Sequence, residues 1–211
     1  NKGATLLIQY PQGREEPYSI PDGVTSIGDY AFNYCTKLTG VTIPNSVTNI
    51  SDGAFYGCTD LTSVEIGSGV TSIGSSAFYG CSQIRDVTYH ANMPSFSAWS
   101  VFSDSYQSWT KLVIGGDVTN IGSYAFYGCI SLTSVEIQDS VTSISEWAFF
   151  GCTGLTGMEI GSSVERIGYY AFSHCESLAS VNIPDSVASI GEYAFGDCYA
   201  LTNAVIGSGV T

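Results

Sequence analysis

Apolar residues recur along the chain in short clusters, separated by Ser, Thr, Asn and Gly rather than gathered into long runs. Between residues 61 and 81 the apolar positions are Leu61, Val64, Ile66, Val70, Ile73, Ala77, Phe78 and Cys81. The spacing of two between Val64 and Ile66 predicts a half-buried strand. A turn at 67–69, a second extended piece at 70–73 and a tight turn of the 3-10 type at 77–81 follow. Since no ten-residue stretch keeps a period of 3.6, the pattern excludes a helix of ordinary length.

This pattern repeats, and the cysteines mark its period. They stand 23 residues apart except for one interval of 48, at Cys35, Cys58, Cys81, Cys129, Cys152, Cys175 and Cys198. The long interval is two periods plus two residues, so one repeat has lost its cysteine and gained two residues. A period of 23 lies in the range of leucine-rich repeats.

A coil of 23 residues cannot bury eight apolar side chains alone, but stacked copies cover one another's open faces. The sequence therefore predicts a mainly-β repeat solenoid, a right-handed curved rod of about nine coils that forms one domain over residues 1–211. One side carries parallel strands and the other carries short extended or 3-10 segments. A strand spacing of roughly 4.8 Å makes the rod about 40 Å long.

Equivalent core residues should form ladders along the rod. One ladder is expected at Phe32, Phe55, Phe78, Phe102, Phe126, Phe149, Phe172 and Phe195. A second is expected at Ile27, Ile50, Ile73, Phe96, Ile121, Ile144, Ile167 and Ile190. Aligned cysteines have parallel Cβ directions, which is poor disulfide geometry. We therefore expect them to be reduced core residues.

Two regions depart from the repeat. The degenerate coil at about 89–112 places Tyr89, Phe96, Phe102 and Trp109 where other coils have Ile66, Ile73, Phe78 and Leu61. Such irregular segments often carry function, although drift of the repeat explains them as well. In the irregular N-terminal coil, 1–21, the segment 6–11 resembles the strand end of an earlier coil. Because solenoids need polar caps and neither end supplies one, we expect this chain to be part of a longer protein.

Composition excludes several classes of partner. Charged residues make up 12% of the chain, and 6 basic against 19 acidic residues give a net charge of −13. A phosphate-binding surface needs clustered Lys and Arg, so nucleic acid is not expected. No apolar run approaches the roughly 18 residues that a membrane span needs, so membrane insertion is not expected either.

The full motif is Val-Thr-Ser-Ile-Gly-x-x-Ala-Phe-x-x-Cys-x-x-Leu-Thr-x-Val-x-Ile-Pro, and it stands at 24–44, 47–67, 118–138, 141–161 and 164–184 with small changes. It resembles the BspA-like (Treponema pallidum type) leucine-rich repeats, over roughly residues 18 to 211. The resemblance implies a secreted or surface-attached protein of host-associated bacteria or protists. Some members are implicated in adhesion to extracellular-matrix proteins, host cells or other microbes.

Two faces of the predicted rod are candidate binding surfaces. The strand face, expected to be concave, should present outward-pointing side chains at Glu65, Asp86, Thr88, Lys111, Glu136, Glu159 and Asn182. On the opposite side, an aromatic stripe precedes the buried alanine at Tyr30, Tyr124, Trp147, Tyr170 and Tyr193. A second row follows the buried phenylalanine at Tyr56, Tyr79, Tyr127 and Phe150. These rings either bind a partner or only shield the turns, and their exposure to solvent distinguishes the two.

No pattern indicates catalysis. His174 adjoins Cys175, but a residue beside a core cysteine should point away from it, and His90 has no nucleophile near it in sequence. Metal, cofactor and catalytic-serine signatures are absent from the sequence, so we expect no enzyme, no metal and no cofactor. The leading hypothesis is an extracellular, adhesin-type module that binds a host or microbial surface protein. The alternatives are a spacer that projects another domain, or a carbohydrate-binding module that uses the aromatic stripe.

Overall fold

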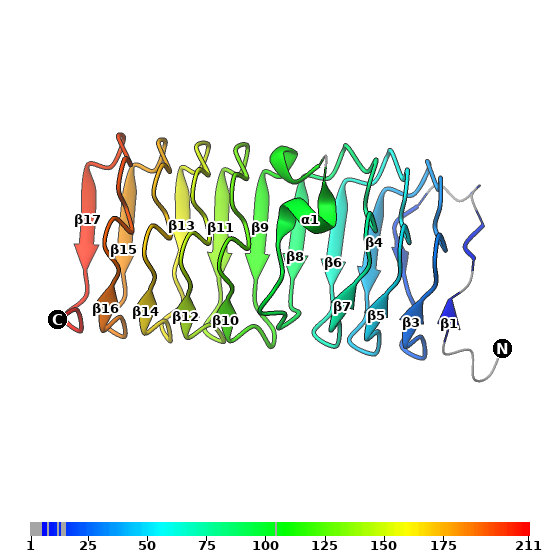
Figure 1. Cartoon of the computed structure of the whole chain (residues 1–211), viewed down its shortest axis with the longest axis horizontal. Coiled ribbons are helices and arrows are strands. Elements are labelled where there is room, and N and C mark those ends of the chain that lie inside the picture. Colours follow the sequence, from blue (N-terminus) through cyan, green and yellow to red (C-terminus); the bar gives the residue numbers. More distant parts are fainter. Residues whose placement is uncertain (1–5, 8, 12, 14–15, 104) are drawn as a thin grey trace.

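The computed structural model describes residues 6–7, 9–11, 13, 16–103 and 105–211. These residues wind into coils stacked along one axis, with the first strand and the last strand at opposite ends of the rod (Figure 1). The predicted parallel solenoid is confirmed, since every strand pair is parallel. Among the described residues no helix has the length and apolarity to cross a membrane.

One strand per coil forms the strand face. The nine strands are β2 (Tyr18–Ser19), β4 (Gly40–Ile43), β6 (Ser63–Ile66), β8 (Asp86–Tyr89), β9 (Lys111–Ile114), β11 (Ser134–Ile137), β13 (Gly157–Glu159), β15 (Ser180–Ile183) and β17 (Asn203–Ile206). Register follows the repeat, so that Val41 pairs with Val64. The first seven strands make one sheet, whereas β15 and β17 pair only with each other. The sheet of the strand face is therefore interrupted, and the break lies between β13 and β15.

Shorter strands line the next side of each coil. They form two sheets, β1 (Leu6–Leu7), β3 (Ser26–Ile27), β5 (Asn49–Ile50) and β7 (Ser72–Ile73), and then β10 (Asn120–Ile121), β12 (Ser143–Ile144), β14 (Arg166–Ile167) and β16 (Ser189–Ile190). The degenerate coil, between β7 and β10, contributes no such strand. There the Asn92 side-chain Oδ1 accepts the Thr119 backbone amide at 3.3 Å, in place of a carbonyl.

The turn segments, which run from the glycine or serine after each short strand to the cysteine, close every coil. In the first regular coil the amides of Tyr30, Phe32 and Tyr34 donate to carbonyls of the next coil. The amides between them donate three residues back within the same coil. Because alternate amides leave the coil, separate turns form here rather than a continuous 3-10 helix.

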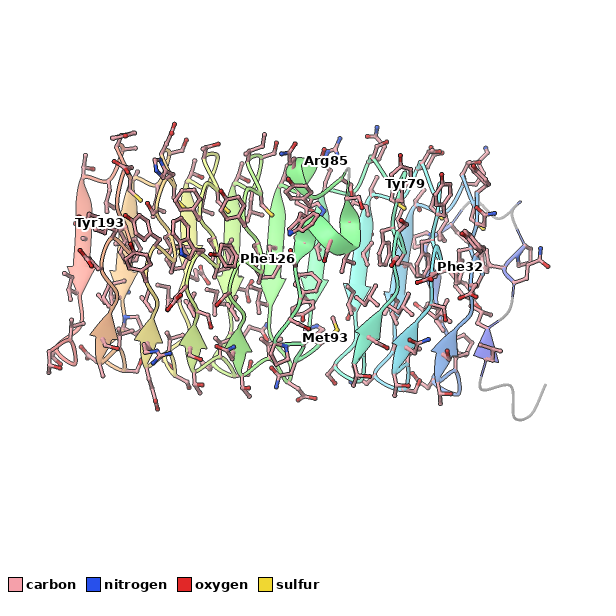
Figure 2. All side chains as sticks on the ribbon, in the orientation of Figure 1. Phe32, Tyr79, Arg85, Met93, Phe126 and Tyr193 are labelled. Carbon is pink, nitrogen blue, oxygen red and sulfur yellow. The ribbon has the colours of Figure 1, made fainter. Side chains whose placement is uncertain are left out.

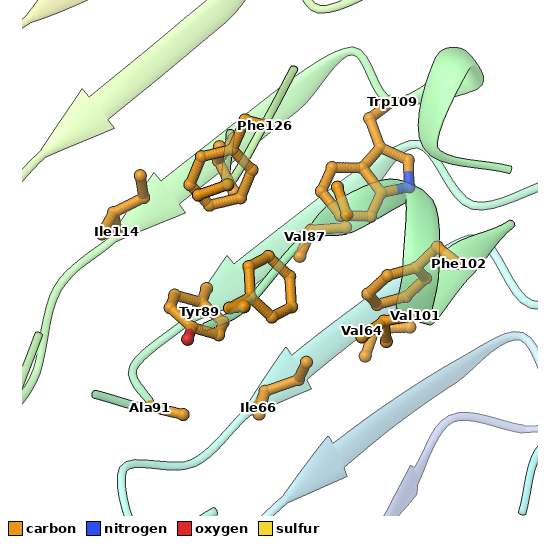
Figure 3. Close-up of a cluster of buried hydrophobic side chains, with 14 of the residues drawn as sticks. Val64, Ile66, Val87, Tyr89, Ala91, Val101, Phe102, Trp109, Ile114 and Phe126 are labelled. Atoms are coloured by element: carbon orange, nitrogen blue, oxygen red, sulfur yellow. The ribbon is translucent and has the colours of Figure 1, made fainter. Parts of the chain in front are cut away.

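The predicted phenylalanine ladder is present in two runs. Neighbouring ring centroids lie 4.5 to 4.8 Å apart from Phe32 to Phe102 and 5.0 to 5.4 Å apart from Phe126 to Phe195. The single unbroken ladder that we expected is wrong at one step, since within the described residues no ring contact joins Phe102 to Phe126. Trp109 bridges this step, 4.7 Å from Phe102 and 6.4 Å from Phe126 (Figure 3).

The degenerate coil contains the helices of the described chain, α1 (Ala98–Phe102) and the 3-10 helix η1 (Tyr106–Ser108). The predicted placements hold, because Tyr89, Phe96, Phe102 and Trp109 are all buried in the core. The serine at 105 occupies the slot of the missing cysteine and is fully buried. Its amide donates to the Phe102 carbonyl, as the amide of Cys129 does to Phe126. One added residue therefore lies before Phe102, in the segment of α1, and the other lies between Ser105 and Trp109, in the segment of η1; α1 is seen near the middle of the rod (Figure 1).

The N-terminal coil differs from the prediction. Leu6 and Leu7 pair with Ser26 and Ile27, so this segment is a short strand of the second side and not the end of a strand-face strand. Tyr10 then stacks on Phe32 at 4.8 Å and is 3% exposed, which extends the first phenylalanine run by one ring. Parts of the 1–21 coil, residues 1–5, 8, 12 and 14–15, lie outside the described residues.

The cysteines belong to the core, as predicted. Six are buried and Cys198 is partly buried in the last complete coil. The thiol of Cys58 donates to the Phe32 carbonyl of the preceding coil at 3.1 Å, and later coils repeat this contact. Burial raises the pKa of the Cys35 thiol to about 11 and also raises that of Cys152. Such thiols stay protonated and are poor nucleophiles at neutral pH.

Candidate binding faces

The aromatic face is built on left-handed backbone. The five residues of the stripe that precedes each buried alanine, here called the inner row, have φ between 53° and 60° (Tyr30, Tyr124, Trp147, Tyr170 and Tyr193). This conformation costs an L-residue roughly 1–2 kcal/mol. The left-handed conformation lets backbone amides donate alternately to carbonyls of the same coil and of the next coil. It also directs these side chains away from the core. The sequence could not show this, because the residue types here favour strands.

The inner row is both stacked and exposed. Ring centroids lie 6.1 Å apart from Tyr124 to Trp147, 4.5 Å from Trp147 to Tyr170 and 5.1 Å from Tyr170 to Tyr193. Tyr30, Tyr124 and Tyr193 are nevertheless 55%, 49% and 55% exposed, while Trp147 and Tyr170 are half-buried. The stripe therefore shields the turns and also remains available to a partner; Tyr193 is labelled on it in Figure 2.

The second row, here called the outer row, runs beside the first in two stacked pairs. Tyr56 lies 5.2 Å from Tyr79, and Tyr127 lies 5.2 Å from Phe150. His174 extends the second pair, with its ring edge-on to Phe150 at 4.9 Å. Tyr79 and Tyr127 are exposed, so the outer row widens the aromatic face around both pairs.

Glycines make room for rings of the preceding coil at the N-terminal end. Gly53 and Gly57 have φ of 58° and 72°, and a Cβ on either would overlap the ring of Tyr30 or Tyr34. The rings of one coil thus lie across the backbone of the next. The next two coils carry Gly53 and Ser76 at the inner-row position, so the inner row has a gap between Tyr30 and Tyr124.

Acidic side chains lie beside the aromatic rings at the C-terminal end of this face. Asp197 raises the pKa of Tyr199, and a hydrogen bond with Tyr169, with burial and the charges of Glu192 and Asp197, raises the pKa of Tyr170. The same Asp197 lies 3.3 Å from the Nε2 of His174.

One site residue on this face was missed by the sequence analysis. Trp99 on α1 is 59% exposed and joins Tyr124, Tyr127 and Trp147 around a hollow of about 320 Å³, here called the α1 hollow. Its signal in the sequence was a tryptophan in the one coil with inserted residues. The insertion is what turns this side chain outward onto the inner row.

The strand face presents its predicted residues to solvent. Glu65, Asp86, Lys111, Glu136, Glu159 and Asn182 are exposed and Thr88 is half-buried. Register places Asp86 beside Lys111 and Glu136 beside Glu159. Glu65 accepts the Thr42 hydroxyl at 3.3 Å and lies 3.9 Å from the Nε2 of His90. Asn182 is set apart, because β15 does not pair with β13.

A hollow lies at the ends of strands β11 and β13 on the strand face. It measures about 780 Å³, is lined by Glu136, Gln138, Asp139 and Glu159 among others, and borders the break in the sheet. Met158 and Ile160 are half-buried there, whereas Val135 and Ile137 in the preceding coil are buried. The result is an acidic trough with apolar side chains at its base.

Among the described residues, His174 and Cys175 do not form a catalytic pair. Cys175 is buried with its thiol on the Phe149 carbonyl, while His174 packs outside on Phe150. Adjacent residues thus point apart, as the sequence predicted. Within the part of the chain that the structure describes, no three His, Cys, Asp or Glu side chains come together as metal ligands would.

Solved structures with this architecture are leucine-rich repeat proteins. One from Eubacterium ventriosum is 27% identical, over 93% of this chain and 47% of its own, with a TM-score of 0.58. The T. pallidum leucine-rich repeat protein is 24% identical, over 92% and 81%, with a TM-score of 0.52, and shares the fold. A leucine-rich cell surface protein from Faecalibacterium prausnitzii is 30% identical, over 91% and 59%, with a TM-score of 0.46.

The chain thus spans about half the length of the Eubacterium protein. Among curated proteins none matches the sequence. The family model of the BspA type leucine-rich repeat region, in six copies, matches residues 15–122 and 100–211. With its 23-residue coils and Ala-Phe-x-x-Cys turns, the chain belongs to the BspA-type leucine-rich repeat family.

Proposed function

We propose that this chain is a non-catalytic, extracellular recognition module of the adhesin type, which binds a protein on a host or microbial surface through its aromatic face. The observation that carries the proposal is the inner row, in which Tyr30, Tyr124 and Tyr193 remain about half exposed on a backbone that is unfavourable for them. Left-handed residues at exposed positions are usually glycine or asparagine. Placing tyrosine and tryptophan there favours a role for the rings themselves.

The geometry of the aromatic face supports protein recognition. Exposed tyrosine and tryptophan are the residues that most often dominate binding energy at protein interfaces. Stacking on neighbours already fixes the rings of Trp147, Tyr170 and Tyr193, so little side-chain entropy remains to be lost on binding. Successive coils extend the contact along the rod, which suits a broad partner.

The strand face is the second surface through which such a module would bind. Its acidic trough at Glu136 and Glu159 complements a basic loop or strand of a partner. Glu65, Asp86, Thr88 and Lys111 continue this polar surface toward the N-terminal coils, and Asn182 lies beyond the break. We place the module outside the cell, secreted or surface-attached, in keeping with its family.

The test is binding of the purified, labelled 211-residue chain to intact epithelial and bacterial cells and to immobilised matrix proteins. Tyr170→Ala with Tyr193→Ala should weaken binding about tenfold, because two interface aromatics are lost. In the same assay Glu136→Gln with Glu159→Gln tests the strand face, and the matched control is Ile130→Ala, which removes an exposed apolar side chain outside both aromatic rows and the strand face and should change binding less than threefold.

Enzymatic treatment of the target surface separates the alternatives. Protease treatment of the cells should abolish binding, and glycosidase treatment should leave it unchanged. Binding that survives protease but is lost with glycosidase and in Trp147→Ala identifies a carbohydrate-binding module instead. If the folded chain binds to none of these surfaces, the result favours a spacer and contradicts the proposal.

A further inference from the structure

The α1 hollow lies where both aromatic rows stop. Phe102 occupies the phenylalanine slot of its coil, so Ser100 and Ser103 stand where the next coil has Tyr124 and Tyr127. Within the described residues, the stacked partners of Tyr124 and Tyr127 are Trp147 and Phe150, both in the following coil. The opposite faces of these two rings are therefore not covered by a stacked ring.

Trp99 adds a further wall beside these two rings, and the resulting hollow remains open to solvent. Trp99 stands on α1, and together with Tyr124, Tyr127 and Trp147 it lines a space of about 320 Å³. This is the lower end of the range for small-ligand sites. The planes of Tyr124 and Tyr127 differ by 47°, so the rings approach an occupant from different directions.

The charges of the turn segments indicate which kind of ligand the α1 hollow would bind. The seven regular turn segments contain Asp29, Asp52, Glu146, Glu192 and Asp197, and they contain no Lys or Arg. The face of an aromatic ring carries the negative end of its quadrupole, which attracts a cation. An anionic ligand is repelled by the same field, and the net charge of −13 raises the local concentration of basic partners.

We infer that the α1 hollow binds an arginine side chain from a basic segment of the partner protein, with the guanidinium held among the rings of Trp99, Tyr124, Tyr127 and Trp147. A guanidinium is planar, weakly hydrated and stacks on aromatic faces, whereas an ammonium is compact and strongly hydrated. The inference rests on the proposed function and deepens it, because it states what the partner presents to this face.

The experiment uses the full chain and a synthetic peptide of alternating arginine and glycine, with binding measured by isothermal titration calorimetry. A peptide of the same length with citrulline in place of arginine keeps the planar shape and removes the charge. Arginine should bind and citrulline should bind at least tenfold more weakly. Equal binding of the two peptides would overturn the inference, since charge would then not be recognised.

Two variants locate the site. Trp99→Ala should weaken arginine-peptide binding about fivefold to thirtyfold, the factor expected from losing one cation–aromatic contact. Tyr30→Ala is the control, because the Tyr30 ring is about as exposed as that of Trp99 but belongs to the inner row far from α1. It should change binding less than twofold. Both side chains are more than half exposed, and circular dichroism checks that each variant is folded.

Each remaining outcome has one meaning. Equal losses in Trp99→Ala and Tyr30→Ala would show diffuse attraction and overturn the site. Binding of a neutral oligosaccharide such as maltoheptaose that is lost in Trp99→Ala, with no arginine-peptide binding, would assign the hollow to sugars and also overturn it. If cell binding through Tyr170 and Tyr193 persists while the arginine peptide does not bind, only this inference fails. If the peptide binds as expected but no cell protein does, the proposed function fails instead.

Discussion

At the scale of single residues, the phenylalanine ladder is the main source of cohesion between coils. Phe149 is fully buried and stacks between Phe126 and Phe172 at 5.2 and 5.0 Å. Its ring removes apolar area from water on both sides at once. The motif predicted this position and its neighbours, because one phenylalanine occurs at the same place in each of the eight coils from Phe32 to Phe195.

Phe149→Ala should lower the free energy of unfolding by about 3–5 kcal/mol, since it leaves a cavity between two coils. Urea denaturation followed by circular dichroism measures the change. Tyr199→Ala is the control, because this ring is 74% exposed, and it should shift stability by no more than about 0.5 kcal/mol. An unchanged midpoint for Phe149→Ala would contradict the ladder as an energetic unit.

The left-handed positions make a second prediction at this scale. Ser76 occupies the inner-row position of its coil with φ of 56° and is exposed. Ser76→Gly should raise the free energy of unfolding by about 0.5 kcal/mol, because relief of left-handed strain exceeds the entropy that glycine adds to the unfolded chain. Ser75→Gly, at the neighbouring position without positive φ, should lower it by about 0.5–1 kcal/mol. Equal signs for the two variants would refute this account of the backbone.

At the scale of elements, the degenerate coil is fully packed into the core of the rod. Trp109 joins the two phenylalanine runs, Ser105 fills the cysteine slot, and the Asn92 side chain replaces a strand carbonyl. The sequence allowed placement of the four large core residues here. It did not allow prediction of α1, because the helix depends on how the two added residues leave the core.

Trp109→Leu restores the residue type of the regular coils, yet it should lower the free energy of unfolding by about 2 kcal/mol. The reason is that the gap between Phe102 and Phe126 is shaped for an indole and leucine leaves part of it empty. Trp99→Ala on the nearby helix should stay within about 0.5 kcal/mol of the parent chain. Thermal unfolding monitored by tyrosine fluorescence gives both values, and parent-like stability of Trp109→Leu would exclude a bridging role.

At the scale of the whole molecule, each coil is stabilised by contacts with its neighbours, so the rod is least stable where contacts between two coils are interrupted. In a solenoid each coil contacts only its neighbours. The phenylalanine ladder changes partner at the degenerate coil, and the strand face divides between β13 and β15. These two joints do not coincide. The strand-face sheet runs on through the degenerate coil, where the short-strand sheet also stops, and the phenylalanine ladder and the short-strand sheet run on past the break after β13.

Hydrogen exchange should reveal the second joint. A peptide covering β15 should reach half-exchange roughly ten times sooner than one covering β11, the factor that ~1.4 kcal/mol of local opening free energy produces. The reason is that β11 pairs on both sides, with β9 and β13, and β15 pairs only with β17. Mass spectrometry of peptic fragments is the measurement, and equal protection of both strands would show that the sheet is continuous in solution.

The repeat, the coil number, the buried ladders and the outward-facing residues of both candidate faces were readable from the sequence alone, because each depends only on a period that recurs in every coil. Tertiary structure decided the rest. The left-handed inner row arises because alternate amides bond to the next coil. The joint at Trp109 and the α1 hollow arise where the degenerate coil, two residues longer, meets its neighbours, and the break after β13 falls between coils of equal length. Such features depend on how two unlike coils fit together, and a repeating pattern carries no information about a mismatch between its copies.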